Sequence, residues 1–184
     1  MTLPPLEERT LSELSKLRVR FFIGASQRVD YLRIMVVHFS GTYPRGCEGN
    51  SDALFMCAMV EAGKAAFDPH GLIYDLSELS YEWGDALGDL FSIGPKYNFG
   101  DHPVAVVVGP HSEEAVRTLC LGLESKESIE AMGFVFRDLA SAWAYVDSRI
   151  IKDTLVKELA KLKQRHGSGP TTEEAGSQEG QPRA

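Results

Sequence analysis

Cysteine is scarce in this sequence. The three residues of this type are Cys47, Cys57 and Cys120, and no two of them form a Cys-x-x-Cys pair. An odd and widely spaced set offers neither a disulfide framework nor a redox motif. Cys57 and Cys120 lie within apolar helical patterns, so we expect both to be small buried side chains in a reducing compartment. Cys47 lies in a predicted loop, where nothing nearby marks it as a nucleophile.

Long apolar runs and a surplus of positive charge are absent as well. No segment approaches the ~20 apolar residues that span a bilayer, and residues 1–17 lack the basic start and apolar core of a signal peptide. The 19 Lys and Arg against 26 Asp and Glu leave a formal net charge of −7. Nucleic acids and anionic membrane surfaces are bound through clustered Lys and Arg, so neither is expected as a partner. The sequence therefore predicts a cytoplasmic protein.

Motifs that carry catalysis or bind cofactors are also missing. The sequence has no phosphate-binding G-x-x-x-x-G-K-[ST] loop and no G-x-S-x-G nucleophile elbow. Its histidines, which form no H-x-x-x-H pair, are His38, His70, His102, His111 and His166. We therefore expect no catalytic residue, no cofactor and no metal site.

One acidic residue stands where the active sites of α/β proteins gather. Asp75 lies at the carboxyl end of a predicted strand at residues 72–76. We assign no His or Lys beside it, so its carboxylate is expected to accept hydrogen bonds from the backbone of a turn at residues 77–80.

Strand and helix patterns alternate along the chain. Short runs rich in β-branched and aromatic residues predict strands at residues 18–23, 31–40, 72–76, 104–108 and 134–136. Apolar residues at helical spacing predict helices at residues 51–67, 84–93, 113–123 and 139–164. Strands that alternate with helices need crossover connections. We therefore expect an α/β fold, a two-layer sandwich in which helices pack on a mixed, mostly parallel central sheet.

Caps and apolar stripes orient these helices. Ser51 or Asn50 is expected to cap the first helix, Ser112 the third and Asp138 the last. The stripe expected to face the sheet consists of Val116, Leu119, Cys120 and Leu123 in the third helix, and of Leu139, Ala142, Val146 and Ile150 in the last.

Composition divides the chain into four parts. Residues 1–17 form a polar extension, and residues 18–151 form the α/β domain. Residues 152–165 continue the last helix with lysines around Leu155, Leu159 and Leu162, a pattern suited to packing on a partner helix in a homodimer. Residues 166–184 contain almost nothing apolar and are predicted to be disordered.

Several local features resemble the STAS domain, the fold of bacterial anti-sigma-factor antagonists. The shared features are an opening strand that ends in Ser40-Gly41, a central strand that ends in Asp75-Leu76-Ser77, Leu87 and Leu90 in a short helix, a Val-rich strand that ends at Gly109, and a closing segment at residues 136–143. The resemblance covers residues 18–150. It implies a regulatory module of bacterial signalling that binds an anti-sigma-factor-like kinase or a neighbour of like fold.

The chain departs from this family at one position. The family's phosphorylatable members carry a serine at the start of the short helix, and the matching position here is Gly84, which has no hydroxyl. The neighbouring Asp85 carries a permanent negative charge near a helix N-terminus, where an anion is favoured. The resemblance then implies a module without the family's phosphorylation switch.

A partner-binding surface is predicted at residues 81–90. The candidate contact residues are Tyr81, Glu82, Trp83, Gly84, Asp85 and Leu87. Tyr and Trp are frequent binding hot spots, and the acidic residues would form a rim around them. The alternative is that both rings pack back onto the core.

Two other functions stay open. One is an acyl-CoA enzyme similar to the crotonase superfamily, because the strand at residues 104–108 and Gly109 resemble the segment before that family's oxyanion-binding glycines. In this chain, however, Pro110, His111 and Ser112 follow Gly109. The other is a toxin-immunity or scaffold protein of the same small acidic fold.

Overall fold

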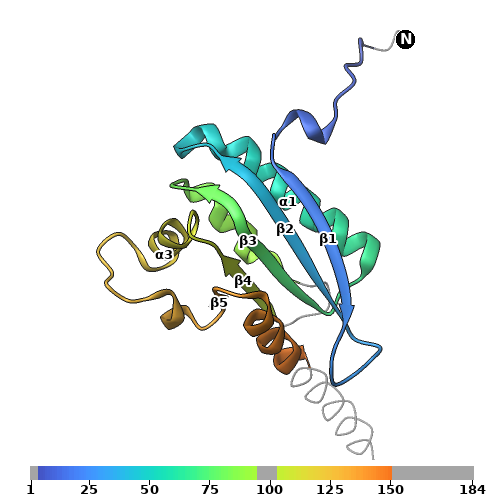
Figure 1. Cartoon of the computed structure of the whole chain (residues 1–184). Coiled ribbons are helices and arrows are strands. Elements are labelled where there is room, and N and C mark those ends of the chain that lie inside the picture. Colours follow the sequence, from blue (N-terminus) through green and yellow to red (C-terminus); the bar gives the residue numbers. More distant parts are fainter. Residues whose placement is uncertain (1–3, 95–102, 151–184) are drawn as a thin grey trace, which may run out of the picture. The chain divides into compact units, whose positions relative to one another are not determined.

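Five strands form one mixed sheet in a computed structural model that describes residues 4–94 and 103–150. The strands are β1 (Arg18–Ala25), β2 (Arg33–Tyr43), β3 (Gly71–Tyr81), β4 (Val104–Val108) and β5 (Val135–Phe136). They lie side by side in chain order, β1 antiparallel to β2 and the others parallel (Figure 1). The predicted mixed and mostly parallel sheet is confirmed.

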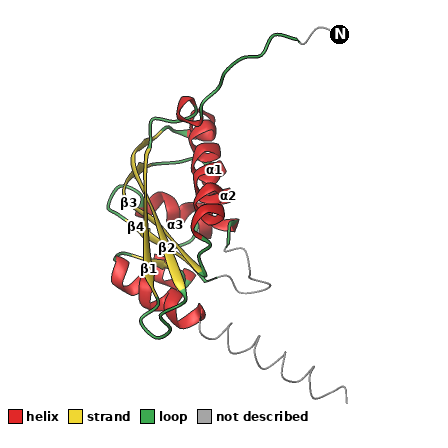
Figure 2. Cartoon of the chain, turned by 90° about the vertical axis from the view of Figure 1, so that its right-hand side faces the viewer, coloured by secondary structure: helices red, strands yellow, loops and turns green. Residues whose placement is uncertain are grey.

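Helices cover both faces of this sheet unequally. The helices α1 (Asn50–Phe67), α2 (Gly88–Ser92) and α3 (Glu113–Leu121) contribute to the larger core cluster, and helical residues 139–150 contribute to a second one (Figure 2). Alternation along β2 divides the two clusters, because Met35 and Val37 enter the first while Ile34 and Val36 enter the second. The predicted α/β packing is confirmed.

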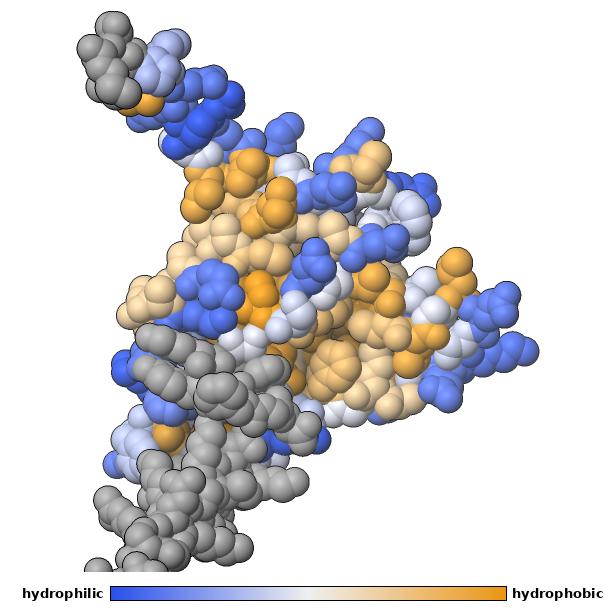
Figure 3. All heavy atoms as spheres, turned by 180° about the vertical axis from the view of Figure 1, so that it is seen from behind, coloured by the Kyte–Doolittle hydropathy of each residue, from blue (hydrophilic) through white to orange (hydrophobic). Residues whose placement is uncertain are grey.

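The face that carries α1 and α2 keeps apolar side chains at its surface. Figure 3, seen from that side, shows hydrophobic residues interrupted by hydrophilic ones. Leu54 is largely exposed, and Phe67 at the end of α1 is also exposed. The stretch of α1 that does face the sheet consists of Ala53, Met56, Val60 and Gly63.

Two strands run further than predicted. β3 continues to Tyr81, so the turn predicted at residues 77–80 is wrong and Asp75 lies inside a strand. β2 continues to Tyr43 because Gly41 pairs with Leu79 and Tyr43 pairs with Tyr81, after a register shift between His38 and Ser40. The extension buries Leu79 and Tyr81, whereas Glu78 before them is exposed and Ser80 between them is half-buried. This is the two-residue alternation of a half-buried strand.

Helix faces and caps depart from prediction at several points. In α3, Val116 is buried but Cys120 is exposed, and Leu123, which lies beyond the end of the helix, is exposed as well. Leu139 is exposed too, whereas Ala142, Val146 and Ile150 are buried as predicted. Asp138 caps its helix, accepting a hydrogen bond from the Ser141 amide at 2.8 Å. α1 begins at Asn50 after Gly49 without a side-chain cap, so the prediction for Ser51 or Asn50 is wrong.

Ser112 occupies the N-cap position of α3 as predicted, but its side chain makes no capping hydrogen bond. Its buried hydroxyl accepts from the Gly109 amide at 3.0 Å and donates to the Leu76 carbonyl at 3.0 Å. It therefore ties the end of β4 to β3. The predicted basic extension at residues 152–165 and the predicted disordered tail at residues 166–184 lie outside the described residues.

Removing that hydroxyl should destabilise the fold. Ser112→Ala leaves a buried amide and a buried carbonyl without their partner, so we expect the free energy of unfolding to fall by about 2 kcal/mol. Urea denaturation followed by circular dichroism measures the change. Ser148→Ala is the control, because that hydroxyl is exposed on a helix and its loss should change stability by less than about 0.5 kcal/mol.

Candidate functional site

A groove lies between the segment after β3 and helix α3. It consists of two adjoining hollows of ≈ 460 and ≈ 320 Å³. The residues that line both hollows are Tyr81, Trp83, Ala115, Thr118 and Leu123. One wall comes from the loop before the short 3-10 helix Asp85–Leu87, and the other comes from α3 and the residues after it.

Two tyrosines support the loop that forms one wall of the groove. The Tyr81 hydroxyl donates to the Gly84 carbonyl at 2.7 Å, and the Tyr81 ring stacks edge-on against Tyr43 with centroids 5.3 Å apart. Burial raises the pKa of the Tyr81 phenol, and burial followed by the charge of Asp52 raises the pKa of Tyr43 to about 12. Both rings are therefore uncharged supports.

The structure separates the six predicted contact residues into two groups. Trp83 is 51% exposed, and Glu82 and Asp85 are also exposed. The three buried residues are Tyr81, Gly84 and Leu87. Tyr81 lines both hollows although little of it is exposed, and Gly84 and Leu87 support the loop from inside the fold.

Sequence reasoning missed the α3 wall of the groove. Leu123 is 81% exposed, although it was predicted to face the sheet. The helix ends at Leu121 and Gly122 follows with φ of 86°, so Leu123 no longer follows the helical stripe. The glycine was the available signal that the stripe stops before Leu123.

Acidic side chains dominate the rim, and most of them have an ionic partner. Glu82 pairs with Arg45 at 3.1 Å, and hydrogen bonds from Arg117 lower the pKa of Glu114. Asp85 lines the smaller hollow and forms no ion pair within the part of the chain that the structure describes. Its carboxylate is therefore the charge at this groove that can receive a cation from outside.

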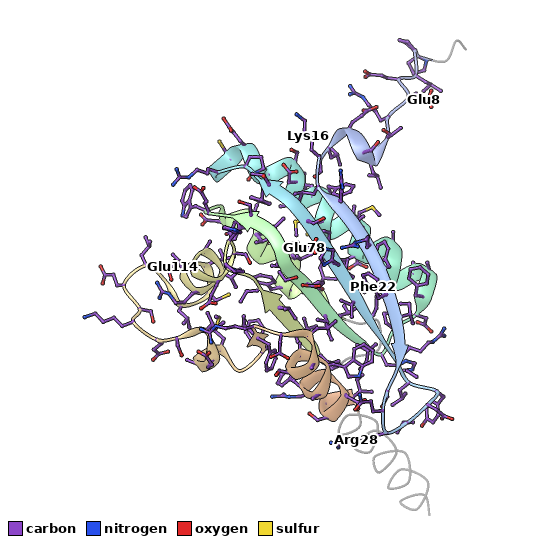
Figure 4. The ribbon with its side chains drawn as sticks, in the orientation of Figure 1. Glu8, Lys16, Phe22, Arg28, Glu78 and Glu114 are labelled. Carbon is purple, nitrogen blue, oxygen red and sulfur yellow. The ribbon has the colours of Figure 1, made fainter. Side chains whose placement is uncertain are left out.

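A second polar arrangement lies on the sheet face opposite α1. The parallel register of β2 and β3 places His38 next to Asp75, with Nδ1 at 2.8 Å from Oδ2. The other ring nitrogen lies 3.2 Å from Oε2 of Glu78, whose position Figure 4 shows on the open side of β3. His38 is buried, and only its doubly protonated ring donates to both carboxylates. The expectation that no histidine stands beside Asp75 is wrong.

Comparisons with protein-family models, curated proteins and solved structures gave no match. The described helices include none that is long and apolar enough to cross a membrane.

The His38–Asp75 pair is fixed in place by its surroundings. Asp75 also accepts a hydrogen bond from the Ser77 amide at 3.0 Å. The sequence predicted a backbone contact of this kind, but in a turn and not in a strand. Within residues 4–94 and 103–150 no three His, Cys, Asp or Glu side chains are grouped to hold a metal ion. Among the residues that the structure describes, no serine or cysteine donates to His38, so the contact that activates a nucleophile is not seen there.

Acid should weaken this pair. Burial acts to raise the pKa of the Asp75 carboxyl, but hydrogen bonds from Ser77 and His38 outweigh it and lower the pKa below its ordinary value. Because the folded-state pKa is lowered, the stabilisation is complete above the ordinary carboxyl pKa of about 3.9. It is lost as the pH falls through the folded-state pKa.

We expect Asp75→Asn to lower the free energy of unfolding by about 2 kcal/mol at pH 7, the usual size for hydrogen bonds to a charged group. The difference from the wild type should shrink as the pH falls below about 4. Urea titrations at several pH values measure it. A difference that is constant with pH would show that the Asp75 carboxylate is not the ionised partner.

Proposed function

We propose that this protein is a non-catalytic protein-binding module whose partner docks in the groove beside Trp83. The observation that carries the proposal is a half-exposed tryptophan at the edge of a hollow, next to Gly84, whose carbonyl accepts a hydrogen bond from buried Tyr81. Large aromatic side chains at such positions dominate the binding energy of protein interfaces. Water leaves both the ring and the hollow when an apolar side chain enters.

The lining indicates the chemistry of the partner. Ala115 and Leu123 present apolar surface across from Trp83, which suits a large aliphatic or aromatic side chain. Asp85 lacks an ionic partner among the described side chains, so a Lys or Arg next to that apolar residue completes the contact. The partner segment is therefore apolar at its centre and basic beside it.

The resemblance to STAS domains adds a biological context to this proposal. We infer a module of bacterial cytoplasmic signalling that binds an anti-sigma-factor-like kinase or a neighbour of like fold. Gly84, at the position of the family's phosphorylated serine, is buried and has no hydroxyl. Binding would then be independent of phosphorylation there. A toxin-immunity or scaffold role would use the same groove.

The crotonase-like alternative receives less support. That chemistry needs a free backbone amide after the Val-rich strand β4 to stabilise an oxyanion. Here the Gly109 amide donates to the Ser112 hydroxyl at 3.0 Å. This donor is already occupied within the fold.

Selection from a displayed random-peptide library tests the proposed partner chemistry. We expect the purified protein to enrich peptides with a large apolar residue next to Lys or Arg. Selection against the Trp83→Ala variant is the matched control and should not enrich them. Enrichment of the same peptides by both proteins, or of acidic peptides, would refute the assignment of this groove.

A further inference from the structure

The outer edge of β1 is unpaired in the part of the chain that the structure describes. Among the described strands β1 pairs with β2 alone, and its register is continuous from Arg18 opposite Ser40 to Ala25 opposite Arg33. The strand has 8 residues and contains neither a bulge nor a proline. No backbone hydrogen bond joins its outer side to another residue of 4–94 or 103–150.

Natural proteins usually protect such an edge, and this one is protected only in part. Edges are normally kept short, bulged, covered or charged, because unpaired amides and carbonyls accept a strand from another chain. β1 carries Arg18 and Arg20 near one end, but Phe22 is 51% exposed and Ile23 is 39% exposed further along. Figure 4 shows Phe22 on the same open face of the sheet as Glu78. The edge therefore combines free hydrogen-bonding groups with apolar surface.

The sequence of β1 is complementary to itself in one orientation. Residues opposite each other in an antiparallel pair share a face, and a two-fold axis at Phe21 or Phe22 brings Arg20 opposite Phe22 or Gly24 of the second copy. Arg20 already lies 5.9 Å from the centroid of the Phe22 ring within one chain. A parallel in-register pair would instead place arginine on arginine, which is unfavourable.

We propose that two copies of this chain associate through antiparallel pairing of their β1 strands about a two-fold axis at Phe21 or Phe22. The two sheets then become one continuous sheet. Exposed Phe22 loses water on both copies, and each arginine faces an uncharged residue. A second copy of the chain always carries the sequence that matches β1, whereas a strand from another protein need not. No residue of β1 lines the groove beside Trp83, so this inference is independent of the proposed function.

The mass of the full-length protein in solution tests this inference. Sedimentation equilibrium should show a reversible dimer for the wild type. Phe22→Lys places a third positive charge on the edge and should raise the dimer dissociation constant about 100-fold or more. Tyr31→Lys is the matched control, since Tyr31 is 67% exposed in the loop after β1 and its replacement should leave the dimer intact. A wild type that is monomeric at millimolar concentration, or a folded Phe22→Lys variant that dimerises unchanged, would overturn the proposal.

Cross-linking provides a second measurement that does not require the charged variant to fold. In a chain whose three cysteines are replaced, Phe22→Cys should give a covalent dimer with a short bismaleimide, and Tyr31→Cys should not. A dimer in sedimentation that is never cross-linked at position 22 would place the interface elsewhere and reject the β1 edge.

Discussion

Gly109→Ala should lower the free energy of unfolding by about 3 kcal/mol or more, the upper range for forcing an extra methyl into a packed site. A Cβ atom at Gly109 would stand 2.0 Å from the carbonyl oxygen of Ser77. That oxygen belongs to the backbone of β3, so no side-chain rotation relieves the contact. β3 and the end of β4 would have to separate, which also strains the Ser112 hydrogen bonds between them.

Chemical denaturation of Gly109→Ala and Gly88→Ala side by side measures this effect. Gly88 lies in α2, and the nearest atom to an added Cβ is a Leu119 methyl at 3.9 Å. Alanine is a better helix former than glycine, so Gly88→Ala should be neutral or stabilise by up to about 1 kcal/mol. Equal stability of the two variants would mean that the approach of Gly109 to Ser77 is not part of the folded state.

Trp83→Ala should weaken partner binding about 100-fold. Truncation of a central aromatic hot spot typically costs about 2–4 kcal/mol, and each 1.4 kcal/mol is a factor of about ten in affinity. Trp83 is exposed, so its loss should leave the fold unchanged. Calorimetric titration of a selected peptide into the wild type and the variant measures the ratio of dissociation constants.

Two further variants separate the ring from its surroundings. Asp85→Lys should weaken a basic peptide more at low salt than at high salt, because the lost contact is between exposed charges. Tyr31→Ala removes another exposed aromatic, 67% exposed and outside the groove lining, and should bind normally. If Tyr31→Ala lost affinity as Trp83→Ala does, the effect would come from general surface apolarity and the groove would have no special role.

The order of strands and helices could be predicted because local composition encodes it. β4 occupies Val104–Val108 as predicted, since a run of valines between turn residues has few alternatives. Strand ends were less predictable. The extension of β3 past Leu76 depends on pairing with β2 and on the burial of Leu79 and Tyr81, and neither is visible in a short window.

The side chains of the candidate site could also be predicted only in part. Sequence alone left open whether Tyr81 and Trp83 both pack inward, because both are aromatic and close together. The extended β3 turns Tyr81 to the same face as Leu79, and Trp83 lies beyond the strand where that alternation ends. The contact between His38 and Asp75 was missed for a related reason. These residues are 37 positions apart, and only the register of two strands brings them together.

The central claim is that a partner binds at Trp83, and ¹⁹F nuclear magnetic resonance tests it most directly. The chain contains two tryptophans, so labelling with 5-fluorotryptophan gives one signal from Trp83 and one from Trp143, assigned with Trp83→Phe. We expect a selected peptide to shift the Trp83 signal and to leave that of Trp143, which packs in the opposite core cluster, unchanged. A bound peptide that shifts only Trp143, or neither signal, would contradict the account.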